Sequence, residues 1–268
     1  MATLGAVIGL TLSPVAVGAK GKSNSTVTET DFGGLFGAAK CARMRLLVGS
    51  EEGRMGEKVS ATCSHSPRAA ATRQRILDAA LAEFAEKGLA GARIDDIAAR
   101  GGVNKRMIYA YFGNKEDLWL TTLERAYAAK RDEESALRVA DLPPLDAMAR
   151  LVSFNLRYTA AHPEFVTLLN QENLHRGAYL RRSGTVQALY TPLLDLIRDV
   201  LRRGVEQGVF RDGVDPMQLY VTIVGVGHFY VANHYTLSAI FGAGLMNQAA
   251  LGEREAHCIE VVLNYLRP

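Results

Sequence analysis

The stretch from Gly101 to Trp119, GGVNKRMIYAYFGNKEDLW, gathers cationic and phenolic side chains within a short segment. The side chains that could do chemistry here are Lys105, Arg106, Tyr109, Tyr111 and Lys115. Ammonium and guanidinium groups pair with phosphate oxygens, and a tyrosine hydroxyl donates a hydrogen bond from a stiff ring. These residue types indicate contact with a polyanion, provided that the neighbouring elements present the side chains together.

The sequence before this segment predicts two helices that could support it. From Arg68 to Lys87 the apolar residues recur at three- and four-residue spacing, which is typical of an amphipathic helix, and Gly88 is expected to end it. A second, short helix is expected from about Ile94 to Arg100. Gly101 and Gly102 then permit the positive φ of a tight turn.

A third helix is expected from Asn104, which can cap it, to Phe112. Ile108 and Phe112 lie four residues apart and are expected to face inward, which leaves the cationic and phenolic residues outward or at the edge. Two short helices joined by a tight turn and supported by a longer one form a helix-turn-helix, whose second helix enters the major groove of DNA. The two cations after Asn104 would reach phosphates or guanine edges, and Lys115 would meet the same phosphate strand from the next helix.

A solvated basic face on a small three-helix domain is the alternative interpretation. The segment from Arg68 to Leu118 holds nine Lys plus Arg against seven Asp plus Glu, so the domain as a whole is barely basic. The third helix itself carries no acid. The acids of the first two helices, which lie outside it, are Asp78, Glu83, Glu86, Asp95 and Asp96. This local asymmetry of charge favours the DNA-reading interpretation.

The segment IDDIAARGGVNKRMIYAYFGNKEDLW resembles the DNA-binding domain of TetR-type transcriptional regulators. It has their Ile-Ala pair, Gly-Val turn, Tyr followed by an aromatic-Phe pair, and Lys followed by acidic residues and Leu. The resemblance implies a homodimer, an all-α C-terminal domain that holds a small effector, and release of operator DNA when the effector binds. It assigns DNA contact to Lys105, Arg106, Met107, Tyr109, Tyr111 and Lys115.

The chain departs from the family pattern at two positions. Where many members have Thr or Ser at the start of the second helix, this chain has Ala92-Arg93, so Arg93 is expected to replace a hydroxyl contact with a charge. Arg106 stands where a small residue is common and is expected to alter sequence preference or to add a phosphate contact. Arg93 and the capping residue Asn104 complete the predicted DNA-contact set.

The chain is predicted to be all-α and to fall into three parts. Residues 1–66 are rich in Gly, Ala, Ser and Thr without sustained periodicity, and we expect a disordered or non-native N-terminal extension, with Met44 and Met55 as alternative starts. Its apolar run lacks the basic residues that begin a signal peptide. Residues 67–114 form the three-helix helix-turn-helix domain, and residues 115–268 form a larger helical effector-binding and dimerisation domain.

The C-terminal part is predicted to begin with a long helix from Lys115 to about Val139. Further helices are expected over residues 145–161, 163–175, 184–207, 215–240 and 247–266, with Asp215 as an N-cap. The last two are apolar and rich in small residues, which suits a dimer interface of two helices from each subunit or, equally, an internal core. The resemblance favours the dimer. The residues concerned are Val221, Val224, Gly225, Gly227, Tyr230, Ile259, Val262 and Leu266.

Hydrogen-bonding side chains within otherwise apolar helices are the candidates for an effector pocket. They are Phe154, Tyr158, Asn170, Asn173, His175, Tyr179, His228, Asn233 and His234, together with Leu169, Leu174, Tyr230 and Tyr235. Each of them can instead be a core residue whose hydrogen bonds are made within the protein, or a surface residue. Aromatic or other apolar acids would fit a pocket of this composition.

Length, composition and net charge place few restrictions on the function. With 268 residues, 48% of them hydrophobic, and a net charge of +3, the chain is an ordinary, mildly basic globular protein. Three cysteines without a CxxC pair favour a reducing cytoplasm. The longest apolar run, Leu219 to Val231, is shorter than the roughly 20 residues of a membrane span, so no membrane partner is expected.

Two rival functions and one variant remain open. An enzyme lacks support because there is no GxSxG, P-loop or GxGxxG motif, and Glu172 with His175 is more typical of a surface ion pair than of an acid–base pair. A zinc site lacks an HxxxH motif, and His228 and His234 are six residues apart, so neither a metal nor another cofactor is expected. An architectural DNA binder without an effector would differ from a ligand-responsive repressor by having no cavity in its C-terminal half.

Overall fold

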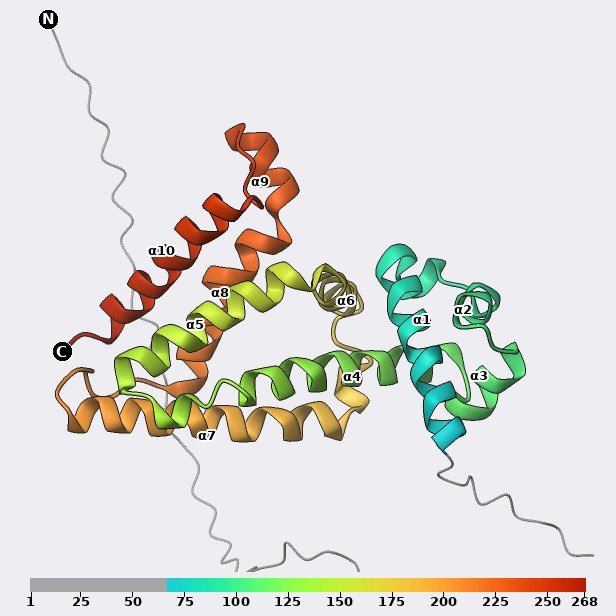
Figure 1. The fold of residues 1–268 in the computed structure, drawn as a ribbon, viewed down its shortest axis with the longest axis horizontal. Helices are drawn as coiled ribbons and strands as arrows, with labels where there is room; N and C mark the ends of the chain where they lie inside the picture. The colour runs from blue at the N-terminus through green and yellow to red at the C-terminus, as the bar shows by residue number, and fades with distance from the viewer. Residues whose placement is uncertain (1–66) are drawn as a thin grey trace, which may run out of the picture. The chain divides into compact units, whose positions relative to one another are not determined.

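The computed structural model describes residues 67–268, and this part of the chain consists of helices and their connections, without a strand (Figure 1). The all-α prediction is therefore confirmed for these residues. The predicted N-terminal extension, including Met44 and Met55, lies outside the described residues.

The helix-turn-helix domain has the predicted elements. Its helices are α1 (Pro67–Gly91), α2 (Ile94–Gly101) and α3 (Lys105–Phe112), followed by α4 (Lys115–Ser135). Gly88, with φ of 68°, interrupts α1 where the sequence predicted its end. Gly102, with φ of 60°, lies in the left-handed region that the tight turn between α2 and α3 requires.

The C-terminal domain continues with six helices. They are α5 (Pro144–Ala161), α6 (Pro163–Leu174), α7 (Gly184–Glu206), α8 (Pro216–Ala232), α9 (His234–Phe241) and α10 (Gln248–Leu266), with short 3-10 turns at Val139–Asp141 and Leu180–Arg182. Proline occupies the first turn of α5, α6 and α8, where its missing N–H costs nothing. Asp215 caps α8 as predicted, since its Oδ1 accepts a 2.7 Å hydrogen bond from the Gln218 backbone N–H.

Two predicted helix boundaries were wrong. The helix that begins at Lys115 ends at Ser135 instead of Val139, because the Ser135 hydroxyl bonds the Asp132 carbonyl and Arg138 turns into the left-handed region with φ of 48°. The single helix predicted over residues 215–240 is divided between α8 and α9 at Asn233. There Asn233 leaves the helical conformation, with φ of −109° and ψ of 14°, and its side chain and backbone N–H both donate to the Phe229 carbonyl.

The first apolar core joins the three helices of the DNA-binding domain to α4 and α6. Trp119 of α4 is fully buried and meets the Phe84 ring edge-on at 5.1 Å between ring centres. Ile108 and Phe112 of α3 are buried in this core as predicted, and Leu168 of α6 is buried in it as well. Helices α4 and α6 of the C-terminal part therefore hold the orientation of the DNA-binding helices.

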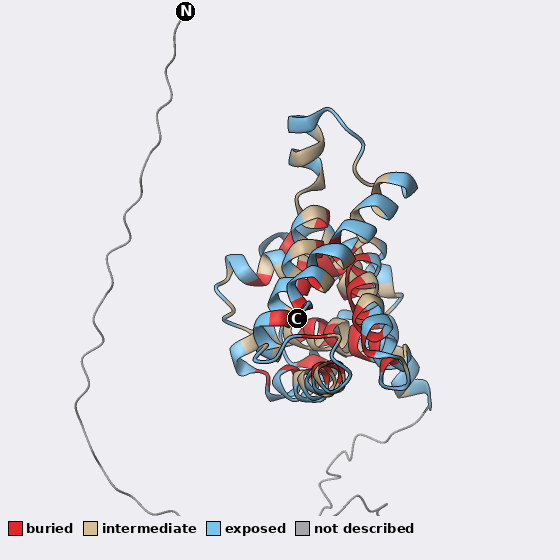
Figure 2. Cartoon of the chain, turned by 90° about the vertical axis from the view of Figure 1, so that its left-hand side faces the viewer, coloured by how far each residue is buried: buried red, intermediate tan, exposed pale blue. Residues whose placement is uncertain are grey.

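The second core fills the space between α5, α7, α8 and α10 (Figure 2, buried residues in red). It includes Val262 and Leu266 of α10, which are fully buried within the subunit. Gly227 of α8 is buried too and lies against Leu156 of α5. The assignment of these three positions to a dimer interface was wrong, because the faces of α8 and α10 that carry them pack against the subunit's own helices.

Candidate nucleic-acid interface and effector domain

The helix α3 is held at both ends by local hydrogen bonds. At its start the Asn104 Oδ1 accepts 2.9 Å from the Arg106 backbone N–H, as the capping prediction required. At its end Gly113 adopts φ of 80°, and the Asn114 Oδ1 accepts 2.7 Å from the Asp117 N–H to begin α4. Because Ile108 and Phe112 anchor the inner face, the other face of α3 is presented to solvent.

Arg106 and Tyr109 are the most available residues of α3. Both side chains are exposed, Tyr109 to 49%, and neither forms a hydrogen bond or ion pair with any residue of the described part. A guanidinium and a phenol with unused donors on one helix face match the requirements for contact with base edges and phosphates. Their contacts with DNA stay a prediction.

Lys105 and Lys115 have partners that sequence reasoning missed. The ammonium of Lys105 lies 3.0 Å from the Asp95 carboxylate, so the acids of α2 are not remote from the basic helix as the charge-asymmetry argument assumed. Both groups are more than half exposed, and an exposed pair of this kind is weak enough to exchange for a phosphate. Lys115 donates 2.9 Å to the Ala92 carbonyl, which ties the start of α4 to the turn before α2.

The remaining predicted contacts differ in exposure. Arg93 occupies the N-cap position of α2, is exposed, and makes no side-chain capping bond, which leaves its guanidinium available. Met107 and Tyr111 are half-buried, and Tyr111 packs against the core beside the Phe112 ring. We therefore expect Tyr111 to shape the DNA-facing surface of α3 as much as to contact DNA itself.

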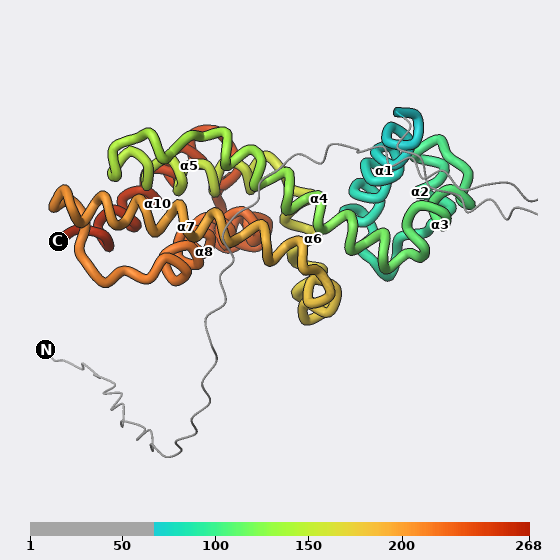
Figure 3. The backbone as a smooth tube through the Cα atoms, turned by 90° about the horizontal axis from the view of Figure 1, so that it is seen from below, coloured from blue at the N-terminus to red at the C-terminus, as the bar shows by residue number. Residues whose placement is uncertain are grey.

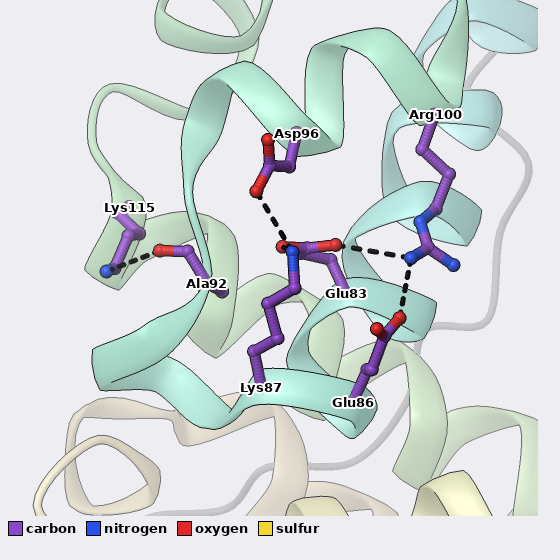
Figure 4. A network of polar contacts seen from close by, with 7 residues as sticks. All are labelled: Glu83, Glu86, Lys87, Ala92, Asp96, Arg100 and Lys115. Carbon is purple, nitrogen blue, oxygen red and sulfur yellow. Dashed lines mark hydrogen bonds and ion pairs between the residues drawn. The ribbon is translucent and has the colours of Figure 1, made fainter.

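A network of charged side chains fixes α2 against α1 (Figure 4). Its centre is Glu83, 1% exposed, which lies 2.7 Å from the Lys87 ammonium and 3.3 Å from Arg100. Lys87 also reaches Asp96 at 3.0 Å, and its hydrogen bonds with Glu83 and Asp96 raise the pKa of its ammonium. This network orients α2, and through the tight turn it orients α3.

One further cation near α3 was not predicted from the sequence. The Arg73 guanidinium of α1 lies 5.2 Å from the centre of the Phe112 ring, and Arg73 is exposed. The start of α1 therefore adds a positive charge beside the end of α3. The sequence feature that could have predicted this cation is the group of three arginines, at positions 68, 73 and 75, that precedes the first acidic residue of α1, Asp78.

Two family models match the chain. Residues 76–121 match the model for bacterial regulatory proteins of the tetR family, and residues 144–262 match that for the tetracyclin repressor-like C-terminal domain. The chain is also 36% identical over 196 residues to the HTH-type transcriptional repressor NicS of Pseudomonas putida, across 73% of this chain and 92% of the relative. The chain belongs to the TetR family.

Other comparisons agree with this membership. An HTH-type transcriptional repressor of Streptomyces coelicolor is 37% identical over 175 residues, across 65% of this chain and 85% of the relative. The solved structure of FadR from Bacillus subtilis, a complex with stearoyl-CoA, superposes with a TM-score of 0.58 at 19% identity. That superposition covers 73% of this chain and 100% of the other, and it shows a common fold. The present chain is thus a DNA-binding transcriptional regulator of the TetR family.

The effector residues predicted for this TetR-family regulator do not gather in one cavity. Asn170, His228 and Asn233 line one hollow of about 540 Å³, beside Tyr220 and Phe229. Burial, and secondarily the charge of Lys130, lower the pKa of the His228 imidazole. These three residues are the part of the predicted set that the structure brings together.

The other predicted effector residues serve separate contacts. Phe154 and Tyr158 pack on each other with ring centres 5.5 Å apart, and Tyr158 is buried. Tyr179 lies edge-on to Trp119 in the DNA-binding core and also contacts His175. The Asn173 side chain donates a hydrogen bond to the Leu169 carbonyl of its own helix. The His234 ring bonds the Val231 carbonyl of the preceding helix.

Sequence reasoning also missed two buried cations in the C-terminal domain. Lys130 and Arg131 of α4 are only 4% and 7% exposed. They belong to the run KRDEES, whose composition is typical of a solvated helix end. No local signal distinguishes them, because α5, α7 and α8 bury them from far along the chain. None of the helices between Pro67 and Pro268 is long and apolar enough to cross a membrane.

Proposed function

We propose that this TetR-family regulator is a repressor that acts as a homodimer on a palindromic operator and leaves it when a small effector binds the C-terminal domain. The observation that carries the proposal is the exposed pair Arg106 and Tyr109 on a helix whose start, end and inner face are all fixed. Two relatives above 30% identity are both named repressors, which supports repression over activation. The site of action is the cytoplasm, where the operator DNA lies.

The dimer is supported by apolar side chains that the subunit leaves uncovered. Met217, Val221 and Phe229 lie along one face of α8 at multiples of four residues and are 52%, 57% and 59% exposed. On α10, Val261 and Tyr265 are 37% and 45% exposed. Two copies joined through these faces would form a four-helix interface with depleted charge, as obligate interfaces have.

The helix α9 adds to this uncovered surface. None of its eight residues is buried, and Tyr235, Ile240 and Phe241 are 80%, 71% and 70% exposed. An apolar patch of this kind on a soluble chain is typical of a protein contact. We assign it to the second copy because it continues from α8, whose last residues lead directly into it.

Helix α4 provides the route from effector to DNA. Its first half buries Leu118, Trp119 and Leu123 in the DNA-binding core, and its second half buries Lys130 and Arg131 in the C-terminal domain. Figure 3 shows α4 running between the two groups of helices. An effector that displaces the second half would tilt α3 and change the spacing of the two recognition helices, which must match about 34 Å of DNA. Its effect is limited to its differential affinity for the two states.

A gel shift across a salt series, with DNA from the region upstream of the gene, tests this function. We expect a discrete complex that weakens steeply with salt and that one compound among aromatic and aliphatic acids dissolves. If sedimentation shows a folded dimer and this protein forms no complex with DNA, the proposed DNA binding is refuted. A complex that no ligand affects would favour the architectural alternative.

A further inference from the structure

Helix α4 carries two neighbouring cations into the interior of the C-terminal domain. Lys130 and Arg131 are each more than nine-tenths buried. Moving an ammonium or guanidinium group out of water costs free energy unless an anion or good hydrogen bonds replace the water. Among the described residues the only carboxylate that pairs with either of them is Glu134, which is 3% exposed.

Arg131 has nitrogens that make no hydrogen bond of normal geometry in the described part. Its Nη1 lies 2.6 Å from a Glu134 carboxylate oxygen, whereas Nε and Nη2 make no such bond, although the guanidinium interacts with the Tyr220 hydroxyl and partly offsets the rise that burial causes in the pKa of that group. The guanidinium lies between two tyrosine rings, with its central carbon 5.0 Å from the centre of the Tyr190 ring and 5.9 Å from that of Tyr220. A guanidinium held between aromatic walls with a free edge matches the planar, two-point geometry of a carboxylate.

Lys130 lacks a carboxylate partner altogether. Its ammonium donates 3.0 Å to the Asn155 side-chain oxygen and lies 5.6 Å and 5.4 Å from the ring centres of Tyr158 and Phe165. Burial, and then the charge of Arg131, lower the pKa of Lys130 to about 8, while Glu134 acts in the opposite direction. The group is thus mostly charged at neutral pH, so two cations share one internal carboxylate.

Space for a ligand surrounds this cluster. Tyr220 lines the hollow of about 540 Å³ described above, Tyr190 lines another of about 500 Å³, and Arg131 lines a third of about 390 Å³. The third hollow also touches Glu134, and all three hollows lie in the size range of small-molecule sites, about 300–1,000 Å³. The walls mix apolar and polar side chains: Val224 and His228 line the first hollow, and Leu193 and Asp132 line the third. The first hollow opens on the α8 face that we assign to the second copy, since Val221 and Phe229 belong to both.

We propose that the effector is a small organic carboxylate with an aromatic or aliphatic body, that Arg131 holds its carboxylate between α4, α7 and α8, and that the charge of the neighbouring Lys130 strengthens the attraction. The assignment names the effector class and rests on the proposed function. An anion would neutralise the excess positive charge and satisfy the free guanidinium edge. A neutral or cationic ligand would do neither.

Binding to the full-length protein without DNA tests the charge requirement. The probes are benzoate, phenylacetate and hexanoate, each paired with its neutral amide, and the readouts are calorimetry and the thermal unfolding midpoint. We expect at least one carboxylate to bind and to raise the midpoint, and its amide, which has nearly the same shape, to bind at least about tenfold more weakly. Failure of all three carboxylates, or equal binding of an acid and its amide, would overturn the proposal.

Substitutions test the two cations. Arg131→Gln and, separately, Lys130→Met are expected to weaken carboxylate binding about tenfold or more. The Lys130→Met change replaces a buried charge by an apolar side chain of similar length, a kind of replacement that is often neutral or stabilising, so it remains informative if Arg131→Gln does not fold. Arg198→Gln, on the exposed face of α7, is the matched control and should bind as the unmodified protein does. Unchanged binding in Lys130→Met and in folded Arg131→Gln would overturn the assignment.

The two proposals fail in different ways. If a carboxylate binds but no DNA complex ever forms, the regulatory function is wrong and the carboxylate site stands. If the DNA complex forms and no carboxylate binds the protein, the function stands and the effector class is wrong.

Discussion

At the scale of single residues, Arg106 and Tyr109 are expected to contribute differently to DNA binding. Both are exposed on α3 without internal partners. Arg106, near the start of the helix, can reach a guanine edge, whereas Tyr109 offers a hydroxyl suited to phosphate. Arg106→Ala should therefore cost about 1–3 kcal/mol on the operator and less on random DNA, and Tyr109→Phe should weaken both equally.

Titration by gel shift on operator and random duplexes checks this difference. Arg198→Ala, an exposed arginine of α7, is the control for the loss of one positive charge. An equal loss of affinity on both duplexes for Arg106→Ala would remove its role in specificity and leave a phosphate contact.

Lys130 gives the protein a predicted pH dependence of stability. Its folded pKa of about 8 lies below the ordinary value of 10.5, so the unfolded chain binds more protons between these values and the free energy of unfolding should rise with pH in that window. The groups facing Lys130 are Arg131 and Glu134 on α4, Tyr158 on α5 and His228 on α8. Because burial raises the pKa of Tyr158 to about 12, the gain should end as unfolded tyrosines begin to ionise near pH 10.

Urea unfolding at intervals between pH 8 and pH 10 measures this effect. We expect a rise of about 1–3 kcal/mol in the unmodified protein and a flatter profile in Lys130→Met. The same slope in both proteins would show that other groups govern the dependence.

At the scale of elements, the local chemistry of the sequence predicts helix ends well where a single residue determines them. Asn104 and Asp215 cap the helices assigned to them, and Gly88 and Gly102 break the chain where positive φ is needed. The division at Asn233 was missed, because an asparagine side chain bonded to the carbonyl four residues earlier also occurs inside a continuous helix, as Asn155 does in α5.

The buried cations of α4 could not be predicted in the same way. Their burial depends on Asn155, Tyr190 and Tyr220, which arrive from three other helices. The sequence periodicity of α4 alone places Lys130 and Arg131 among charged neighbours, as on a solvated face. The effector set chosen from polar residues of apolar helices recovered Asn170, His228 and Asn233 around one hollow, and it omitted the charges on the polar helix.

The end of α7 depends on one close approach. A Cβ atom added to Gly204 would lie 1.9 Å from the Phe210 ring, which is itself buried in the second core. Gly204→Ala should therefore displace Phe210 and lower the free energy of unfolding by about 1–3 kcal/mol. Thermal or urea unfolding measures the loss.

Gly252→Ala is the matched control, since an added Cβ there meets no atom within 4 Å inside helix α10. It should raise the free energy of unfolding by up to about 1 kcal/mol through helix propensity. A Gly204→Ala protein as stable as its parent would show that Phe210 repacks without cost.

At the scale of the whole molecule, the regulator is expected to depend on its dimer. One recognition helix makes too few contacts to hold an operator, whereas two helices at a fixed spacing read both half-sites together. Val221 lies at the centre of the uncovered α8 face and is 57% exposed in the single subunit. Val221→Asp should therefore leave the subunit folded while placing two like charges in the proposed interface, one from each copy.

Sedimentation and gel shift on the same samples test the link between assembly and DNA binding. We expect Val221→Asp to sediment as a monomer at concentrations where the parent is a dimer, and to lose the discrete operator complex. Leu174→Asp makes the same change at the end of α6, where the side chain is 76% exposed, and should alter neither property. A dimeric Val221→Asp protein would place the interface elsewhere, and a monomer that still forms the full complex would show that the operator itself brings the two subunits together.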